Sequence, residues 1–285
     1  MAQILDGRAV SDSLLAEVQR DVEELKQKGV FPKLVVIFVG ENAASQVYVR
    51  KKQEACEKVG MLSEKLELPA SISQDALIAE IERLNHDPEV HGMILQLPIP
   101  KHLEVSKIIK AIDPVKDVDG FQAYNVGKMF LSAEFENMAP CTPKGITKIL
   151  EFYKIDVSGM NIVVIGRSNI VGKPMGVMLL NRDATVTICH SKTKDLEKFT
   201  READLLVAAV GKPRFVKADM VKEGAIVIDV GMHRTEDGKL CGDVDFETVE
   251  PKVSMITPVP GGVGPMTVAC LLMNTVTAAR KQVTL

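Results

Sequence analysis

The sequence lacks the residue patterns that mark a disulfide-stabilised or zinc-binding protein. Its cysteines are dispersed, odd in number and never spaced as C-x-x-C, and its five histidines include no H-x-x-x-H pair. This argues against a disulfide scaffold and against zinc, so we predict no metal site and interpret the thiols as core residues. The cysteines are Cys56, Cys141, Cys189, Cys241 and Cys270.

The sequence also lacks an excess of charge of either sign. Its 35 lysines and arginines against 38 aspartates and glutamates give a formal net charge of -3, which predicts no basic surface for nucleic acid or an anionic membrane. A hydrophobic content of 46% and a charged content of 26% are typical of a soluble globular protein. A length of 285 residues fits one large or two medium domains, and we expect two.

One segment without charged residues, from Ser254 to Ala279, is long enough to cross a bilayer. Three prolines and three glycines break its first half, and the remaining Met266 to Ala279 is shorter than the ~20 residues that a spanning helix needs. We therefore expect a loop and a buried helix, and no membrane segment. Asp6 and Asp12 would interrupt the apolar core of a signal peptide, so we expect a cytoplasmic protein.

Alternating apolar patterns in the first part of the chain predict the α/β fold class. Helices are expected at about residues 10–28, 44–59, 77–84 and 103–112, and strands at 34–39, 66–68 and 93–97. The stretch 113–140 lacks a clear period and is interpreted as a domain junction. Thr142 as N-cap, with Pro143 at the first helical position, then predicts another helix.

From Asn161 the alternation becomes more regular. Strands are expected at 162–165, 185–188, 205–210 and 225–230, with helices from about 172 and at about 195–202. Continuous apolar strands separated by helices indicate a parallel sheet covered on both faces. This order is typical of a doubly wound nucleotide-binding sheet, whose ligands bind at the carboxyl ends of the strands.

A glycine-containing turn follows the first strand of this second region. Gly166, Arg167 and Ser168 lead to Gly172 at a predicted helix start, where a dinucleotide pyrophosphate meets free backbone N–H groups. The spacing departs from G-x-G-x-x-G, because Ser168 stands at the second glycine and Gly172 comes one residue late. An ordinary strand-to-helix turn remains the alternative.

The end of the next strand indicates which dinucleotide binds. NAD-binding sheets usually place a carboxylate there to bind the ribose 2′-hydroxyl, but this strand ends in Cys189, His190, Ser191 and Lys192. Arg167, Ser191 and Lys192 could hold a 2′-phosphate by charge-assisted hydrogen bonds. We predict NADP over NAD, the alternative being solvated loop cations.

Three polar residues in the first region are candidates for a site of proton transfer. Tyr48 and Lys52 are four residues apart and project from one helix face, where the pair could orient a carbonyl or water and move a proton. An ordinary solvated helix is the alternative. Gln96 interrupts an apolar strand near its carboxyl end, where it could face a ligand or a catalytic lysine, or be satisfied by loop backbone.

Two loops could contact a ligand. In the segment 116–120, Asp119 could accept hydrogen bonds from an amino-pyrimidine edge, or cap its own backbone in an Asp-Gly turn. In the segment 257–267, three glycines among three prolines form a stiff loop whose backbone can approach a ligand closely, or a rigid linker.

Taken together, these segments resemble the bifunctional methylenetetrahydrofolate dehydrogenase/cyclohydrolase family over essentially the whole chain. The carrying segments are Ala44 to Lys52, Gln96-Leu97-Pro98, Lys116 to Phe121, Pro140 to Pro143, Gly166 to Pro174, His190 to Thr193 and Pro258 to Thr267.

The resemblance implies NADP-dependent oxidation of 5,10-methylenetetrahydrofolate to the methenyl cation and its hydrolysis to 10-formyltetrahydrofolate. It implies that Lys52 is the general acid/base, that Tyr48 orients and stacks on the substrate, that Gln96 tunes Lys52, and that Asp119 anchors the pterin. It places the cofactor at Gly166, Arg167, Ser168, Ser191 and the backbone of Met232. It places further substrate contacts at Leu97, Pro260, Gly261 and Gly262.

The resemblance also implies a domain arrangement. A discontinuous catalytic, folate-binding domain is expected at 1–120 plus 265–285, with a Rossmann NADP-binding domain inserted at 121–264, a cleft between them, and a homodimer formed through the cofactor domain. Gln122-Ala123 and Met232 depart from the residues that the family commonly has there, His-Pro and isoleucine.

Two other functions stay open from the sequence. One is a dehydrogenase of the same family with little cyclohydrolase activity, which would use the same cleft. The other is a non-catalytic dinucleotide sensor that binds a protein partner, which would have no folate affinity.

Overall fold

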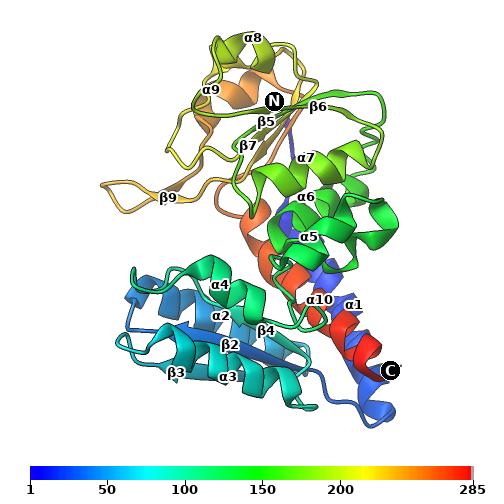
Figure 1. Cartoon of the computed structure of the whole chain (residues 1–285). Coiled ribbons are helices and arrows are strands. Elements are labelled where there is room, and N and C mark those ends of the chain that lie inside the picture. The colour runs from blue at the N-terminus through cyan, green and yellow to red at the C-terminus, as the bar shows by residue number, and fades with distance from the viewer. Residues whose placement is uncertain (284–285) are drawn as a thin grey trace. The chain divides into compact units, whose positions relative to one another are not determined.

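The structure, a computed structural model, describes residues 1–283 and divides into two compact units (Figure 1). The large-sheet unit contains Met1–Asp12, Met129–Glu136 and Pro140–Thr267. The small-sheet unit contains Ser13–Lys128, Asn137–Ala139 and the chain from Val268 onward. Two long helices, α1 (Gly7–Gln27) and α10 (Val263–Val283), contribute residues to both units.

The small-sheet unit is built on three parallel strands in the order β3-β2-β4. They are β2 (Lys33–Val39), β3 (Leu62–Leu68) and β4 (Gly92–Leu95). In the register, Val36 of β2 lies beside Lys65 of β3 and Ile94 of β4. The central strand β2 is apolar and buried from its second residue on, whereas the edge strand β3 carries charged residues, as its position requires.

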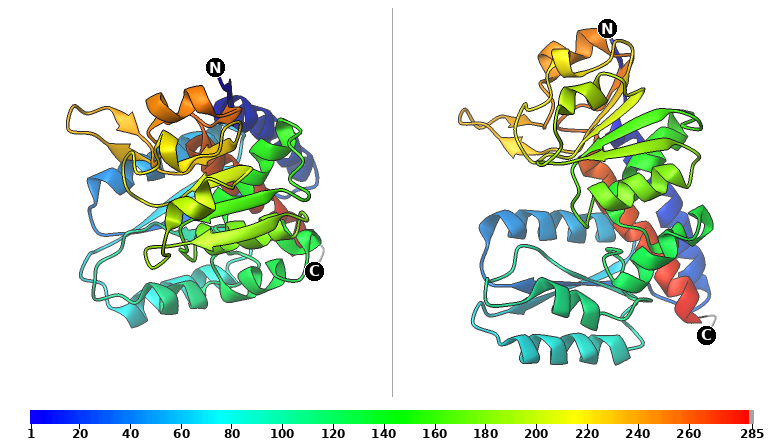
Figure 2. Two further views of the ribbon diagram at one scale, coloured as in Figure 1. Left: turned by 90° about the horizontal axis from the view of Figure 1, so that it is seen from above. Right: turned by 45° about the horizontal axis from the view of Figure 1, so that its top comes forward.

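Helices cover this sheet on both faces: α2 (Ala43–Lys58), α3 (Gln74–His86) and α4 (Val105–Ala111), followed by α5 (Ala123–Met129). Figure 2 shows α2 and α3 on opposite sides of the strands. Leu77, Ile81 and Leu84 form the apolar stripe of α3 and belong to the same core as β2. The starts of α2 and α3 are capped, with Asn42 accepting from the Ser45 N–H at 2.9 Å and Ser73 from the Ala76 N–H at 3.2 Å.

The large-sheet unit contains a six-stranded parallel sheet in the order β1-β11-β8-β7-β5-β6. Its strands are β1 (Gln3–Ile4), β5 (Asn161–Ile165), β6 (Thr185–Cys189), β7 (Leu205–Ala208), β8 (Ile226–Asp229) and β11 (Met255–Ile256). The main helices are α6 (Cys141–Phe152), α7 (Gly172–Leu180), α8 (Leu196–Thr200) and α9 (Phe246–Val249). An antiparallel hairpin, β9 (His233–Arg234) with β10 (Leu240–Cys241), follows β8.

The boundaries of the two units are not those of the domains expected from the sequence, 1–120 with 265–285 and 121–264. Residues 1–12 belong to the large-sheet unit because Gln3 pairs with Met255 and Ile4 with Ile256. This pairing adds the first strand of the chain to the edge of the six-stranded sheet. It was not predicted, since a two-residue strand has no measurable period.

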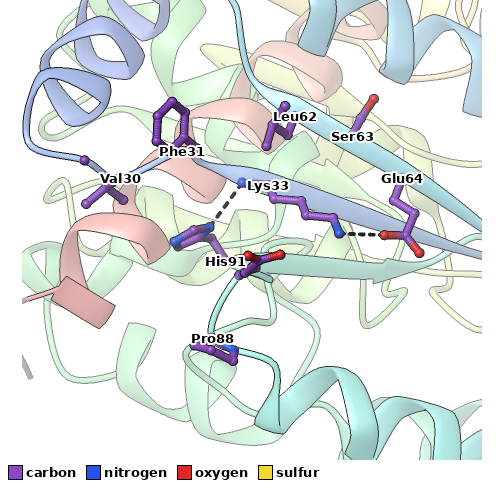
Figure 3. A pocket seen from close by; sticks show the side chains of 10 residues that line it. Val30, Phe31, Lys33, Leu62, Ser63, Glu64, Pro88 and His91 are labelled. Carbon is purple, nitrogen blue, oxygen red and sulfur yellow. Dashed lines mark hydrogen bonds and ion pairs between the residues drawn. The ribbon is translucent and has the colours of Figure 1, made fainter.

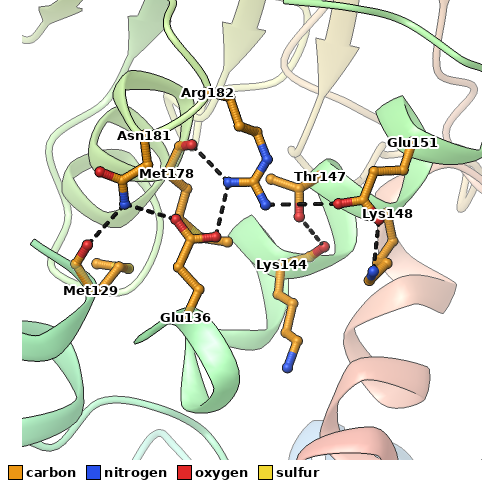
Figure 4. A network of polar contacts seen from close by, with 9 residues as sticks. All are labelled: Met129, Glu136, Lys144, Thr147, Lys148, Glu151, Met178, Asn181 and Arg182. Atoms are coloured by element: carbon orange, nitrogen blue, oxygen red, sulfur yellow. Dashed lines mark hydrogen bonds and ion pairs between the residues drawn. The ribbon is translucent and has the colours of Figure 1, made fainter. Parts of the chain in front are cut away.

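A network of polar contacts in the large-sheet unit holds Glu136 of the 3-10 helix Ala133–Met138 (Figure 4). The buried Glu136 carboxylate accepts from Asn181 Nδ2 at 2.9 Å and from Arg182 Nη1 at 2.8 Å. Asn181 also donates to the Met129 carbonyl, and Arg182 to the Met178 carbonyl. The segment is therefore fixed to the end of α7 by charge-assisted bonds rather than by an apolar stripe.

The prediction of an α/β fold with parallel sheets is confirmed. The predicted N-cap at Thr142 is wrong, because α6 begins at Cys141 and its N-cap is Pro140, without a side-chain cap. The stretch interpreted as a junction contains α5 and the 3-10 helix just described. All five cysteines are buried, as expected, and none of them forms a disulfide within the described part of the chain. Among residues 1–283, no helix combines the length and apolar character needed to cross a membrane.

Candidate functional site

The carboxyl edge of the three-stranded sheet brings the predicted proton-transfer residues together. The strand β2 ends at Val39 and leads through the cap residue Asn42 into α2, which carries Tyr48 and Lys52. Gln96 follows directly after β4, which pairs in parallel with β2. Since parallel strands end at the same edge, α2 and Gln96 meet there, where α/β sheets bind ligands.

Lys52 and Gln96 are in direct contact. Lys52 Nζ donates to Gln96 Oε1 at 3.0 Å, while Gln96 Nε2 donates to the Leu97 carbonyl at 2.9 Å. The backbone N–H of Gln96 donates to the Ile37 carbonyl of β2 at 2.9 Å. The loop carbonyl thus fixes which way the amide faces, and its oxygen is presented to the lysine. Both side chains are half-buried, so the lysine amine is held without being closed off from a ligand.

Tyr48 lies one turn before Lys52 on α2, with 49% of its surface exposed. Cys56 lies one turn after Lys52 and is fully buried. Burial raises the pKa of the Cys56 thiol to about 12, although the nearby Lys52 opposes this rise. A thiol with so high a pKa is no nucleophile at neutral pH, so the chemistry of this helix face belongs to the tyrosine and the lysine.

The loop after α4 uses two of its charged residues to hold itself in place. Buried Lys116 donates to the carbonyls of Leu84 at 2.9 Å and Asp87 at 2.6 Å, and burial lowers its pKa. Buried Asp117 accepts from the Gln122 N–H at 2.8 Å and from Asn125 Nδ2 at 2.9 Å, and burial raises its pKa.

Asp119 lies toward the same edge as Gln96. A parallel bridge pairs Asp117 with Met93 of β4, so the chain after Asp117 runs toward the carboxyl end of that strand. Asp119 is half-buried and precedes Gly120, whose φ is 74°. The small-sheet unit therefore carries Tyr48, Lys52, Gln96 and Asp119 at one edge of its sheet.

A cavity of about 310 Å³ lies at the carboxyl ends of β5, β6 and β7 in the large-sheet unit. Gly166 forms part of its lining and has a φ of 134°. A Cβ at this position would lie 2.3 Å from the Ala209 carbonyl oxygen, and one at Gly172 would lie 2.0 Å from the Gly166 oxygen. Only glycine permits this tight turn, which leaves bare backbone facing the cavity, as a pyrophosphate requires.

The Ser168 side chain stabilises the turn between β5 and α7. Its hydroxyl oxygen accepts from the Val171 N–H at 3.1 Å and from the Gly172 N–H at 3.4 Å. The side chain thereby satisfies N–H groups at the start of α7 that a bound anion would otherwise meet. Other exposed side chains that line this cavity are those of Arg167, Ser191 and Lys212.

Some lining residues of this cavity were not singled out from the sequence. They are Ile165, His190, Leu196, Ala209, Val210, Lys212 and Phe215. Lys212 could have been found, because it follows the end of β7 as Ser191 follows the end of β6. Lys192, which the sequence suggests as a 2′-phosphate ligand together with Arg167, is not among the residues that line the cavity. Its backbone N–H donates to His190 Nδ1 at 3.1 Å.

The proline-glycine loop packs against the start of α1 within the large-sheet unit. The Arg8 N–H donates to the Gly261 carbonyl at 3.1 Å, and a Cβ at Gly7 would lie 1.8 Å from the Gly262 oxygen. Gly261 and Gly262 are buried, whereas Pro260 is exposed. Met232 is 41% exposed, and its Cε would lie 2.8 Å from a Cβ placed on Gly264.

A larger cavity, of about 640 Å³, lies at the other edge of the three-stranded sheet (Figure 3). Phe31, Lys33, Leu62 and His91 line it near the amino ends of the strands. Lys33 Nζ pairs there with Glu64 at 2.6 Å, and the Lys33 N–H donates to His91 Nδ1 at 3.2 Å. Because ligands of parallel sheets bind at the carboxyl ends, we place the functional site at the opposite edge despite the larger volume here.

Comparison with known proteins relates the whole chain to one family. The model for the tetrahydrofolate dehydrogenase/cyclohydrolase catalytic domain matches residues 5–119, and the model for the NAD(P)-binding domain of the same family matches residues 140–283. The bifunctional protein FolD of Campylobacter curvus is 56% identical over 280 residues, covering 98% of this chain and 96% of the relative.

Two solved structures are similar over almost their full length. The FolD methylenetetrahydrofolate dehydrogenase/cyclohydrolase of Campylobacter jejuni is 50% identical with a TM-score of 0.95, covering 99% of each chain. The FolD of Trypanosoma brucei, solved with NADP cofactor and inhibitor, is 37% identical with a TM-score of 0.94, covering 100% of this chain and 99% of its own.

Proposed function

Because this chain belongs to the tetrahydrofolate dehydrogenase/cyclohydrolase family, we propose that it oxidises 5,10-methylenetetrahydrofolate to the methenyl cation and hydrolyses that cation to 10-formyltetrahydrofolate. NADP supplies the hydride acceptor when bound. The single observation that carries the assignment of the reacting site is the hydrogen bond from Lys52 to Gln96 at the carboxyl edge of the small sheet.

Lys52 is the proton-transfer residue in this proposal. A protonated lysine would repel the cation that hydride loss creates, whereas a neutral amine tolerates it and can take a proton from the attacking water. Gln96 Oε1 accepts one N–H of the amine at 3.0 Å and so fixes where Nζ stands. Gln96 is thus a positioning residue for Lys52.

The proposal also includes the other substrate contacts predicted from the sequence. Tyr48 stacks on the substrate from the turn of α2 before Lys52, and Asp119 accepts from the amino-pyrimidine edge of the pterin. Leu97, whose carbonyl orients Gln96, contacts the substrate beside it. The segment Pro260–Gly262 completes the substrate-binding set.

NADP is proposed to bind in the 310 Å³ cavity of the large-sheet unit. The bare backbone at Gly166 fits a pyrophosphate, as its glycine-only turn indicates. Arg167 and Ser191 bind the 2′-phosphate, while Ser168 and the backbone of Met232 complete the cofactor contacts. In this proposal 121–264 is the cofactor domain and 1–120 with 265–285 is the catalytic domain, although residues 1–12 pack with the large-sheet unit.

A calorimetric titration with folic acid tests the substrate site. The wild-type chain is expected to bind folate, and Asp119→Asn to bind it about tenfold more weakly, because a charged acceptor is lost. Asp75→Asn, an exposed carboxylate in the first turn of α3, is the matched control and should bind as the wild type does.

Two outcomes would contradict the proposal. Binding of NADP without any folate affinity would favour the non-catalytic sensor. Folate binding without hydrolysis of methenyltetrahydrofolate in the absence of cofactor would favour a dehydrogenase alone.

We also propose that the protein forms a homodimer through its large-sheet unit and that it is located in the cytoplasm. The strand β6 is an edge strand with unpaired backbone groups, and the unit exposes Leu131 by 70% and Leu180 by 61%. Buried thiols that form no disulfide within the described residues agree with a reducing compartment.

Sedimentation equilibrium should give twice the chain mass of 31.1 kDa for the wild type. Leu131→Asp should shift it toward the monomer, because a charge in an apolar interface lacks a partner. Leu62→Asp, an exposed leucine of the small-sheet unit, is the control. A monomeric wild type would contradict the dimer.

A further inference from the structure

The fully buried Asp243 lies behind the NADP cavity and accepts four hydrogen bonds. Its Oδ2 accepts from the N–H groups of Val210 at 2.6 Å and Gly211 at 2.9 Å. Its Oδ1 accepts from the N–H of Lys212 at 3.0 Å and from His233 Nε2 at 2.7 Å. One carboxylate thus gathers three consecutive backbone donors.

Those three donors belong to a wall of the cavity. They follow β7, and both Val210 and Lys212 line the 310 Å³ space together with Arg167 and Ser191. Gly211 has a φ of 74°, the left-handed conformation that lets successive N–H groups turn toward one anion. The Asp243 carboxylate therefore fixes the backbone conformation of this wall.

Asp229 supports this carboxylate from the end of β8. Its Oδ1 accepts the Asp243 N–H at 2.9 Å and its Oδ2 accepts the Val244 N–H at 2.9 Å. A Cβ at Gly242 would lie 1.8 Å from Asp229 Oδ2, and one at Gly231 would lie 2.4 Å from Asp243 Oδ1. Burial, with the Asp243 charge as a further cause, raises the pKa of Asp229 to about 6. The chain therefore leaves space at two glycines for two buried carboxylates.

We infer that Asp243 is a positioning residue for the cofactor, because it holds residues 210–212 in the shape in which they form one wall of the NADP cavity. The inference rests on the proposed binding of NADP in that cavity. Asp243 touches no cofactor itself, since it is entirely buried.

The test is the dissociation constant of NADP, measured by calorimetry without substrate. Asp243→Asn keeps the shape of the side chain but turns an amide N–H₂ toward two of the four donors, so NADP should bind about tenfold or more weakly. Asp245→Asn is the matched control, because it makes the same change two residues along, where Asp245 makes no side-chain cap bond. It should leave the constant unchanged.

A second variant tests the same loop without touching the carboxylate. A Cβ at Gly211 would meet no atom within 4 Å, so Gly211→Ala adds no clash and penalises only the left-handed backbone that the convergence of N–H groups needs. It should also weaken NADP binding. This variant decides the question if Asp243→Asn does not fold.

Several outcomes separate the possibilities. A folded Asp243→Asn, or a Gly211→Ala variant, with the wild-type affinity for NADP would overturn the inference. If Asp243 has a purely structural role, Asp243→Asn should lower the melting temperature and leave the affinity for NADP unchanged. If Asp243 positions the cofactor, the variant should raise the KM for NADP by a larger factor than it lowers the rate of cofactor-independent hydrolysis. Arg167→Ala serves as the check on the cavity: if it too leaves NADP binding unchanged, the proposed cofactor site is wrong, and the inference with it.

Discussion

Replacing Lys52 by methionine is expected to lower the rate of methenyltetrahydrofolate hydrolysis about 10³-fold, the effect of losing a positioned general acid/base. Methionine keeps most of the length and apolar character of the lysine stem but has no amine to take the proton of the attacking water. Gln96 Oε1 also loses its donor at 3.0 Å. The measurement is the disappearance of methenyltetrahydrofolate without NADP, which isolates hydrolysis from hydride transfer.

The neighbouring Lys51 provides the matched control. It is exposed on α2, so Lys51→Met makes the same chemical change outside the contact with Gln96 and should retain the wild-type rate. Folate affinity should stay within a few-fold in both variants, because Tyr48 and Asp119 remain. Hydrolysis at the wild-type rate in Lys52→Met would remove the lysine from the mechanism.

Replacing two exposed polar residues at the ends of β5 and β6 is expected to weaken the preference for NADP strongly. In the double variant Arg167→Ser with Ser191→Asp, a guanidinium is lost and a carboxylate faces the 2′-phosphate. The loss of charged hydrogen bonds is worth about 3 kcal/mol, or roughly 100-fold in kcat/KM for NADP. The value of kcat/KM for NAD should not fall, because NAD carries no phosphate at that position.

Lys192→Ser is the control for this exchange. Lys192 is next to Ser191 in the chain and equally exposed to solvent, but it is not among the residues that line the cavity. Its removal should therefore leave the preference for NADP intact. An undiminished kcat/KM for NADP in the double variant would show that the 2′-phosphate is bound elsewhere.

The elements that could be predicted from the sequence are those with a long apolar pattern or with stabilising contacts close by in the chain. The strand β2 is a continuous apolar run, so its buried central position is readable from its residues. Gln96 could be singled out because one amide within an apolar run of the sequence needs a hydrogen-bond partner; the structure places it directly after β4. That its partner is Lys52 was implied by the family resemblance and not by the pattern of the residues, and the two atoms lie 3.0 Å apart.

The elements that were missed depend on distant parts of the chain. The short helix α5 is tied down by Asn125, which donates to the Pro114 carbonyl and to Asp117, and no period could reveal it. Asp243 gathers N–H groups about 30 residues earlier in the chain. The cap of α6 was misplaced because threonine and proline also fit inside a first helical turn, where N–H groups lack partners.

The pairing of β1 with β11 has a consequence for how the chain folds during synthesis. Gln3 and Ile4 leave the ribosome long before their partners, Met255 and Ile256, have been made. Contacts between such distant residues form late, because a long loop must be closed before they are gained. The strand β1 must therefore wait without its native partner, and available to chaperones, until β11 has been made.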